Sequence, residues 1–161
     1  MAALQALLDR SYAGAGGHLL SIHTPGRRLD AAGVVAGLQG MCLLTLATVS
    51  ADGRPFVGPV DGIFYRGSFH FGSAPDSLRF RHIRARPDVS ATHLPGEELA
   101  VTVHGRAVEV DTSGGPFREA LLELYVPRYG PEWERFLDSG PLYARIEARR
   151  MFAFHAPPEP A

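Results

Sequence analysis

The middle of the chain alternates apolar and polar side chains with the period of two that is typical of β-strands. Tight-turn sequences separate several of these stretches, among them Asp52-Gly53, Arg66-Gly67 and Pro95-Gly96. Strands are predicted over residues 41–50, 55–65, 68–72, 89–94, 99–110 and 142–154. Six strands joined mostly by hairpins predict a mainly β protein with short helices, built as a small antiparallel barrel.

Helical spacing occurs outside these strands. Leu4, Leu7 and Leu8 predict a helix over residues 2–10, and Asp30 is the expected N-cap of a second one. The glycine-rich stretch between them has no preceding strand and no following periodic helix, so it is interpreted as a linker and not as a dinucleotide loop. This linker covers residues 13–17. The helix capped by Asp30 is expected over residues 31–39, and two more helices are expected around residues 117–125 and 132–137.

In two of the predicted strands, the side chains on each face indicate what that face contacts. Both faces of the strand over residues 55–65 are apolar, with Phe56, Val60 and Phe64 on one and Val57, Ile63 and Tyr65 on the other. A barrel has one interior, so the outer apolar face is expected to need a partner subunit or a bound ring system. The strand over residues 99–110 places Leu99, Val101, Val103 and Ala107 inward and Thr102, His104 and Arg106 outward. This polar row either meets solvent or lines a site.

Composition narrows the chemistry. The 161 residues carry a formal net charge of -1, and all 16 basic residues are arginine. Without lysine the chain has no Schiff-base nucleophile and no P-loop lysine. A near-neutral chain with one short arginine-rich segment does not favour nucleic-acid binding. The single cysteine, Cys42, lies in an apolar run and is expected to be a buried hydrophobe.

Export and membrane insertion are not expected. The first ten residues lack the basic lead of a signal peptide and contain Gln5 and Asp9. No run approaches the roughly 18 apolar residues that a membrane span requires. A cytoplasmic protein without a membrane partner is therefore predicted.

The segment over residues 69–87 carries the most chemistry. A strand ends, a turn passes through Pro75, and a short helix begins near Asp76 or Ser77. A helix start directs free backbone N–H groups at one point, where an anion is favoured. Arg79 adds a fork of donors suited to phosphate, and residues 76–88 hold four arginines against two aspartates. The alternative is a surface helix whose arginines only face water. Phe80 and Ile83, three residues apart, are expected to form the buried stripe of this helix and not to contact a ligand.

These elements together resemble the pyridoxamine 5'-phosphate oxidase-like, flavin-binding split-barrel superfamily. The resemblance rests on three runs: LLTLATVSADGRPFVGPV, FYRGSFHFGSAPDSLRFRHIRARPDVS and ELAVTVHGRAVEV. It implies a homodimeric six-stranded antiparallel split β-barrel with two flavin sites at the subunit interface. The implied organisation is a helical and linker segment over residues 1–40, a flavin-binding split-barrel domain over 41–155 and a flexible tail over 156–161.

The resemblance also implies site residues. Ser77 and Arg79 match the serine and basic residue that hold the cofactor phosphate, with Ser73 in the preceding turn and His82 at a position that is polar in the vitamin B6 oxidases. The backbone along the flavin ring corresponds to Gly58, Pro59, Val60 and Asp61. Vitamin B6 oxidases also carry an arginine and a lysine on this strand, where Gly58 and Ile63 stand here, and their C-terminal Arg-Leu-x-Pro signature has no counterpart. Vitamin B6 oxidation is therefore not expected.

The implied function is that of actinobacterial flavin or deazaflavin oxidoreductases, with FMN or coenzyme F-420 transferring hydride to a small organic substrate. Since the flavin ring carries such chemistry, no catalytic side chain is required. Two alternatives stay open: a non-catalytic flavin-binding dimer, and a metal- or haem-binding protein that uses the histidines. The aromatic residues of segment 116–140 either form a lid over the cofactor or pack as ordinary helices. The strand histidines are His70, His93, His104 and His155, and the aromatic residues are Tyr125, Tyr129, Trp133 and Phe136.

Overall fold

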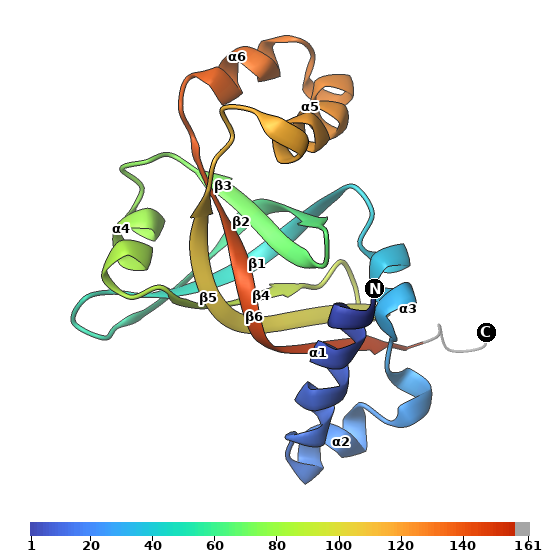
Figure 1. Cartoon of the computed structure of the whole chain (residues 1–161). Helices are drawn as coiled ribbons and strands as arrows, with labels where there is room; N and C mark the ends of the chain where they lie inside the picture. The colour runs from blue at the N-terminus through green and yellow to red at the C-terminus, as the bar shows by residue number, and fades with distance from the viewer. Residues whose placement is uncertain (157–161) are drawn as a thin grey trace.

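A computed structural model describes residues 1–156 of the chain and contains the six predicted strands (Figure 1). They are β1 (Met41–Val49), β2 (Pro55–Tyr65), β3 (Ser68–Ser73), β4 (Asp88–His93), β5 (Leu99–Val110) and β6 (Leu142–His155). Neighbouring strands are antiparallel and close a ring in the order β1-β2-β3-β6-β5-β4. The predicted mainly β antiparallel barrel is confirmed, and each predicted strand end lies within one residue of the observed end.

Helices surround the barrel: α1 (Ala2–Ala13), α2 (Gly17–Ile22), the 3-10 helix η1 (Pro25–Arg27), α3 (Ala31–Gly37), α4 (Leu78–Ala85), α5 (Gly115–Tyr129) and α6 (Glu132–Asp138). The linker predicted over residues 13–17 is therefore shorter, since only residues 14–16 lie outside a helix. α2 was not predicted, because none of its side chains is buried and its sequence carries no apolar stripe.

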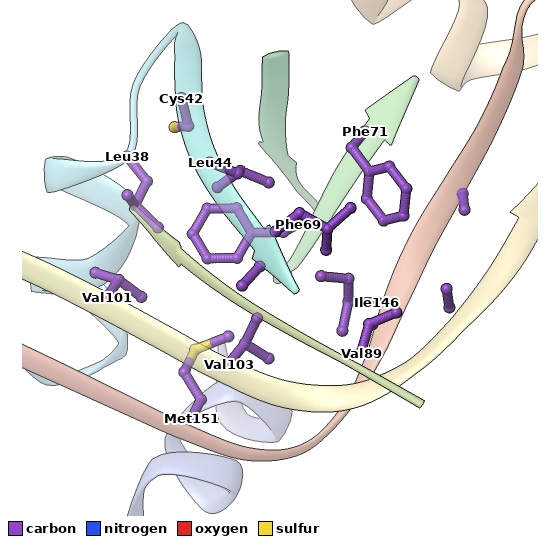
Figure 2. Close-up of a cluster of buried hydrophobic side chains, with 14 of the residues drawn as sticks. Leu38, Cys42, Leu44, Phe69, Phe71, Val89, Val101, Val103, Ile146 and Met151 are labelled. Atoms are coloured by element: carbon purple, nitrogen blue, oxygen red, sulfur yellow. The ribbon is translucent and has the colours of Figure 1, made fainter. Parts of the chain in front are cut away.

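The barrel interior is packed with the inward side chains of β1, β3, β4, β5 and β6 (Figure 2), and Val60 of β2 belongs to the same cluster. Phe69 and Phe71 of β3 and Val101 and Val103 of β5 have no exposed surface. Cys42 lies among them with 1% exposure, which confirms its expected role as a small buried hydrophobe. Burial raises the pKa of its thiol, so the group stays protonated.

The N-terminal helix α1 is tied to the last strand of the barrel. Leu4, Leu7 and Leu8 belong to the same apolar cluster as the barrel interior. The Tyr12 hydroxyl donates to the carbonyl of Ala153 at 2.8 Å, and the N–H of Met151 donates to Ser11 Oγ at 2.9 Å. Helix α1 and β6 lie side by side in Figure 1, so the two ends of the chain share one core.

A tight turn was predicted in two hairpins, at Arg66-Gly67 between β2 and β3 and at Asp52-Gly53 between β1 and β2. The first matches the prediction more closely. Arg66 and Gly67 both have positive φ angles, 47° and 83°, as a two-residue hairpin turn requires. Between β1 and β2 only Gly53 has positive φ, at 88°, whereas Asp52 was expected to share that conformation. The carboxylate of Asp52 instead bonds the Ser50 hydroxyl and the Arg54 guanidinium inside a longer turn.

The outer face of β2 is covered by this chain itself at one end only. Ile63 is buried in a second apolar cluster with α5 and α6, and Tyr65 packs on Phe117 of α5 with ring centroids 5.4 Å apart. The expectation that this whole face needs a partner or a bound ring was therefore wrong for the end nearer β3. At the other end Val57 remains 70% exposed.

The described part of the chain has no helix with the length and apolar character needed to cross a lipid bilayer. Of the tail predicted over residues 156–161, all but Ala156 lies outside the described residues.

Candidate functional site

The turn between β3 and α4 positions the predicted phosphate-binding residues. Ser77 is the N-cap of α4, and its Oγ accepts a hydrogen bond from the N–H of Phe80 at 3.3 Å. Phe80 and Ile83 are buried in the barrel cluster, as predicted for the apolar stripe of this helix. The buried stripe fixes α4 against the barrel, and the capped first turn faces the edge formed by β2 and β3.

Arg79 connects the two strands at that edge. Its Nη1 donates to Ser73 Oγ at 3.1 Å, and its Nη2 donates to the carbonyl of Pro59 at 2.9 Å. The side chain is half-buried, and this burial lowers its pKa, although an arginine remains charged at neutral pH. A Cβ at Gly58 would lie 3.9 Å from Nη2, so the guanidinium rests directly beside the glycine backbone.

A hollow of about 290 Å³ opens beside this guanidinium, and we call it the arginine hollow. Its walls come from β1, β2 and α4. They are Leu46, Thr48, Phe56, Val57, Gly58, Ser77, Leu78, Arg79 and His82. The walls are mostly apolar, and the only formally charged group among them is Arg79. A phosphate with an apolar extension matches this combination.

His82 forms the inner wall of the arginine hollow. Its ring is buried, its Nδ1 shares a hydrogen bond of 3.0 Å with Thr48 Oγ1, and its centroid lies 4.7 Å from that of Phe56. The ring is therefore held in place by β1 and β2. The His82 ring is therefore a fixed part of the wall of the arginine hollow.

The other arginines of α4 and of its C-cap point to protein groups or to solvent. Arg84 donates to the carbonyl of Pro75 at 3.0 Å and forms an ion pair with Glu109 at 3.3 Å. Arg86 donates to the carbonyl of Ala51, and Arg81 is exposed. Of the positive charge predicted at this helix, only Arg79 faces the arginine hollow.

A second hollow of about 250 Å³ lies on the outer side of the same edge, under α5 and α6; we call it the aromatic hollow. Tyr125 and Trp133 stack in its wall with centroids 4.5 Å apart and planes inclined by 19°. The lining is Asp61, Gly72, Ser73, Ala74, Pro75, Tyr125, Trp133, Phe136, Ser139, Gly140, Pro141 and Tyr143. Segment 116–140 thus both packs on the barrel and walls a cavity.

The residues proposed for cofactor binding are divided between the arginine hollow and the aromatic hollow. Gly58, Ser77, Arg79 and His82 line the arginine hollow. Asp61 lines the aromatic hollow, as does Ser73, which bonds Arg79. Pro59 contributes its carbonyl to Arg79. The side chain of Val60 points into the barrel with 7% exposure, so only its backbone is available at the edge.

The outward polar row of β5 lies apart from both hollows. His104 Nδ1 bonds Ser90 Oγ at 2.8 Å, and the hydroxyls of Thr102 and Thr92 bond each other at 2.9 Å, both across β4 and β5. Arg106 is exposed. These contacts place the row on the outer surface of the barrel, where it lines neither of the two hollows.

The histidines do not gather into a metal centre. His70 and His93 bond the backbone carbonyls of Ser68 and Leu43 at 3.1 and 2.9 Å. Among residues 1–156 no group of three histidine, cysteine, aspartate or glutamate side chains is placed to hold a metal ion.

Sequence reasoning missed part of the arginine hollow. Leu46 and Thr48 line it from β1, and Phe56 and Val57 from β2. The strand alternation placed these residues on particular faces, but it gave no indication that α4 covers that end of the barrel. The signal available in the sequence was the apolar character of both faces of this strand, which includes Phe56 and Val57; in the structure these two side chains are 39% and 70% exposed.

Comparisons with known proteins agree with this architecture. The family model described as pyridoxamine 5'-phosphate oxidase matches residues 33–156. No curated protein matches the sequence. The conserved hypothetical protein Rv2991 from Mycobacterium tuberculosis has a similar structure, with a TM-score of 0.66 and 20% identity, over 86% of this chain and 96% of that one.

Two further solved structures share the fold. HutZ, the haem storage protein from Vibrio cholerae, gives a TM-score of 0.61 at 18% identity, covering 77% of this chain and 94% of its own. An FAD-binding protein from Mesorhizobium loti gives 0.58 at 23% identity, covering 81% and 98%. The family model spans all six strands of the barrel, the β3–α4 turn and helix α4 with Arg79. The chain belongs to the pyridoxamine 5'-phosphate oxidase family.

Proposed function

We propose that the protein binds a flavin, FMN in preference to coenzyme F-420, and transfers hydride to or from a small organic substrate. The observation that carries the proposal is the position of Arg79. Its guanidinium is fixed between Ser73 and Pro59 at the mouth of an otherwise uncharged hollow. A bound flavin would supply the hydride chemistry, and the protein would supply binding and orientation.

The residues present fit the phosphate end of such a cofactor. Arg79 already makes two hydrogen bonds that hold its planar fork in place, so little side-chain entropy is lost when it also binds an anion. Ser77 places a hydroxyl and the first-turn N–H groups of α4 beside it. A charge-assisted hydrogen bond of this type contributes about 1.5–3 kcal/mol.

The ring end of the cofactor is proposed to lie along residues 58–61 of β2. The backbone here is accessible, since Gly58 has no side chain and Pro59 and Asp61 point outward. Val57 on the same outer face is 70% exposed, and Leu43 on the neighbouring strand is 55% exposed. We assign this apolar surface to the partner in a homodimer, in which each flavin would lie at the interface.

Vitamin B6 oxidation is not supported by the second strand. The family's arginine position is Gly58, whose backbone adjoins Arg79, and its lysine position is Ile63. Ile63 is buried at 7% exposure under α5 and α6, where a lysine would lose hydration without an anion to pair with. The phosphate grip therefore rests on Ser77 and Arg79, and the substrate differs from that of the vitamin B6 oxidases.

Haem binding is the second candidate, because HutZ, which shares this fold, is a haem storage protein. Purified protein would be titrated separately with FMN, coenzyme F-420 and haem while its visible absorption spectrum is recorded. The flavin proposal predicts a saturable shift of the FMN bands and bleaching of bound FMN by a nicotinamide donor. A saturable change with haem alone would contradict it, and FMN binding without reduction would indicate the non-catalytic form.

A further inference from the structure

The aromatic hollow has the walls of a cation-binding site. Tyr125, Trp133, Phe136 and Tyr143 supply π surfaces around about 250 Å³. Trp133 is held by stacking on Tyr125, and its ring lies 6.0 Å from that of Phe136 at an angle of 53°. The π face of an aromatic ring carries partial negative charge, so an aromatic lining favours a positive ligand.

One carboxylate gives this hollow its charge. Asp61 is the only formally charged residue in the lining, and it points outward from β2. Within residues 1–156 no arginine or histidine forms an ion pair with it. Arg79 lies at the edge of the hollow, but its hydrogen bonds go to Ser73 Oγ and the carbonyl of Pro59 and not to Asp61. Arg118 of α5 pairs with Glu134 and Asp138, and Arg145 of β6 pairs with Glu147.

The two tyrosines of the lining respond to that charge. Burial, followed by the negative charge of Asp61, raises the pKa of Tyr143 to about 12. The pKa of Tyr125 is raised by the same burial and by its neighbours Tyr143 and Asp61. Both phenols are therefore neutral at physiological pH, and Asp61 is the only anion that faces the hollow.

We propose that the aromatic hollow binds a small organic cation that carries a substituted ammonium group. The apolar substituents would contact the aromatic walls, and the positive charge would face Asp61 and the ring faces. A ligand of this class is excluded from the arginine hollow by the charge of Arg79. Neutral or anionic ligands of the same shape would leave Asp61 without a counter-charge in the bound state.

The position suggests what the cation is for. Ser73 lines the aromatic hollow and also accepts the hydrogen bond of Arg79, so the two hollows meet at this residue. Asp61 ends the stretch of β2 assigned to the flavin ring. We assign the bound cation as the substrate, and this assignment rests on the proposed function. Binding of the cation to the aromatic hollow does not depend on that function.

The test uses Trp133, which is the only tryptophan of the chain. Full-length protein without flavin would be titrated with choline and with its neutral isostere 3,3-dimethylbutan-1-ol at constant ionic strength, following tryptophan emission. We expect a saturable change with choline at concentrations at least tenfold lower than with the isostere. Equal affinities for the two probes, or no saturable change with choline, would overturn the proposal.

Variants separate charge from packing. Asp61→Asn should weaken choline binding at least fivefold and leave the isostere unaffected, while Glu97→Gln, an exposed position in the turn between β4 and β5, should change neither. Phe136→Leu, at a 51% exposed position, should weaken choline selectively by removing one π surface. Unchanged choline affinity in both Asp61→Asn and Phe136→Leu would overturn the assignment. Arg79→Ala removes a positive charge at the edge of the hollow, so it should weaken FMN binding without weakening choline binding, and a failure of flavin binding is distinguishable from a failure here.

Discussion

Ser77 and Arg79 have separate structural and binding roles that can be measured independently. Ser77 caps α4 through its hydroxyl, and Arg79 joins α4 to β2 and β3. Their residue types and spacing were sufficient to predict an anion site at this helix. The two acceptors of Arg79 were not predictable, because they depend on how closely β2 and β3 approach the first turn of α4.

Ser77→Asp separates the cap from the anion site. Aspartate caps helices as well as serine does, so the free energy of unfolding should change by less than about 0.5 kcal/mol. Its carboxylate would repel the cofactor phosphate, so FMN affinity should fall more than tenfold while riboflavin, which has no phosphate, binds as before. Thermal unfolding and flavin fluorescence titrations measure the two effects. Undiminished FMN affinity in this variant would place the phosphate elsewhere.

At the scale of elements, the strands and hairpins follow local rules, whereas the helices depend on tertiary packing. The strand over residues 99–110 was predictable because its alternation and its Pro95-Gly96 turn are local. Helix α5 extends to Tyr129, beyond its predicted end, and covers Ile63 and Tyr65 of β2. The sequence periodicity of α5 and of β2 does not indicate that these two elements pack against each other.

Helix α5 makes the stability of the fold sensitive to pH through His70. The ring lies 4.5 Å from Phe117 of α5, and burial, with a smaller effect of Arg145, lowers its pKa to about 4. Below pH 6.5 the unfolded chain binds a proton that the folded protein does not, so stability falls as pH drops from about 6.5 to about 4. Between pH 7 and pH 5 the loss from this group is about 2 kcal/mol.

Urea unfolding of His70→Gln tests this dependence. The variant should lose about 2 kcal/mol less than the parent protein when the pH is lowered from 7 to 5. His18→Gln, at an exposed position of α2, is the matched control and should retain the parent dependence. Parallel pH profiles for the parent and His70→Gln would show that α5 does not keep this histidine neutral.

For the whole molecule, the order of hairpins along the chain was enough to predict the barrel, but the positions of the two hollows were not. Each hollow forms where distant elements meet: α4 with β1 and β2 in one case, and α5 and α6 with β2, β3 and β6 in the other. The alternation along residues 55–65 predicts the apolar outer face of β2. Its division into a part covered by α5 and a part left open depends on the complete chain.

The open part leads to a prediction about assembly. Val57 and Leu43 lie on adjacent strands of the outer face, and a homodimer would bury both. Val57→Glu should convert a dimer into a monomer at micromolar concentration and lower FMN affinity with it, because a charge at a buried interface is costly. Light scattering after gel filtration measures the mass. Ile22→Glu, on α2 and 42% exposed, lies away from β1 and β2 and should stay dimeric.

A dimeric Val57→Glu variant would move the interface to another surface. A parent protein that is monomeric at all accessible concentrations would refute the homodimer altogether.

The most direct test of the account is the affinity of the parent protein and Arg79→Ala for FMN and for riboflavin. If Arg79 binds the phosphate, the substitution should weaken FMN binding about 10- to 100-fold and change riboflavin binding by less than about twofold, as loss of a charge-assisted contact requires. Equal losses for both ligands, or no loss for FMN, would contradict the assignment of the arginine hollow as the phosphate site.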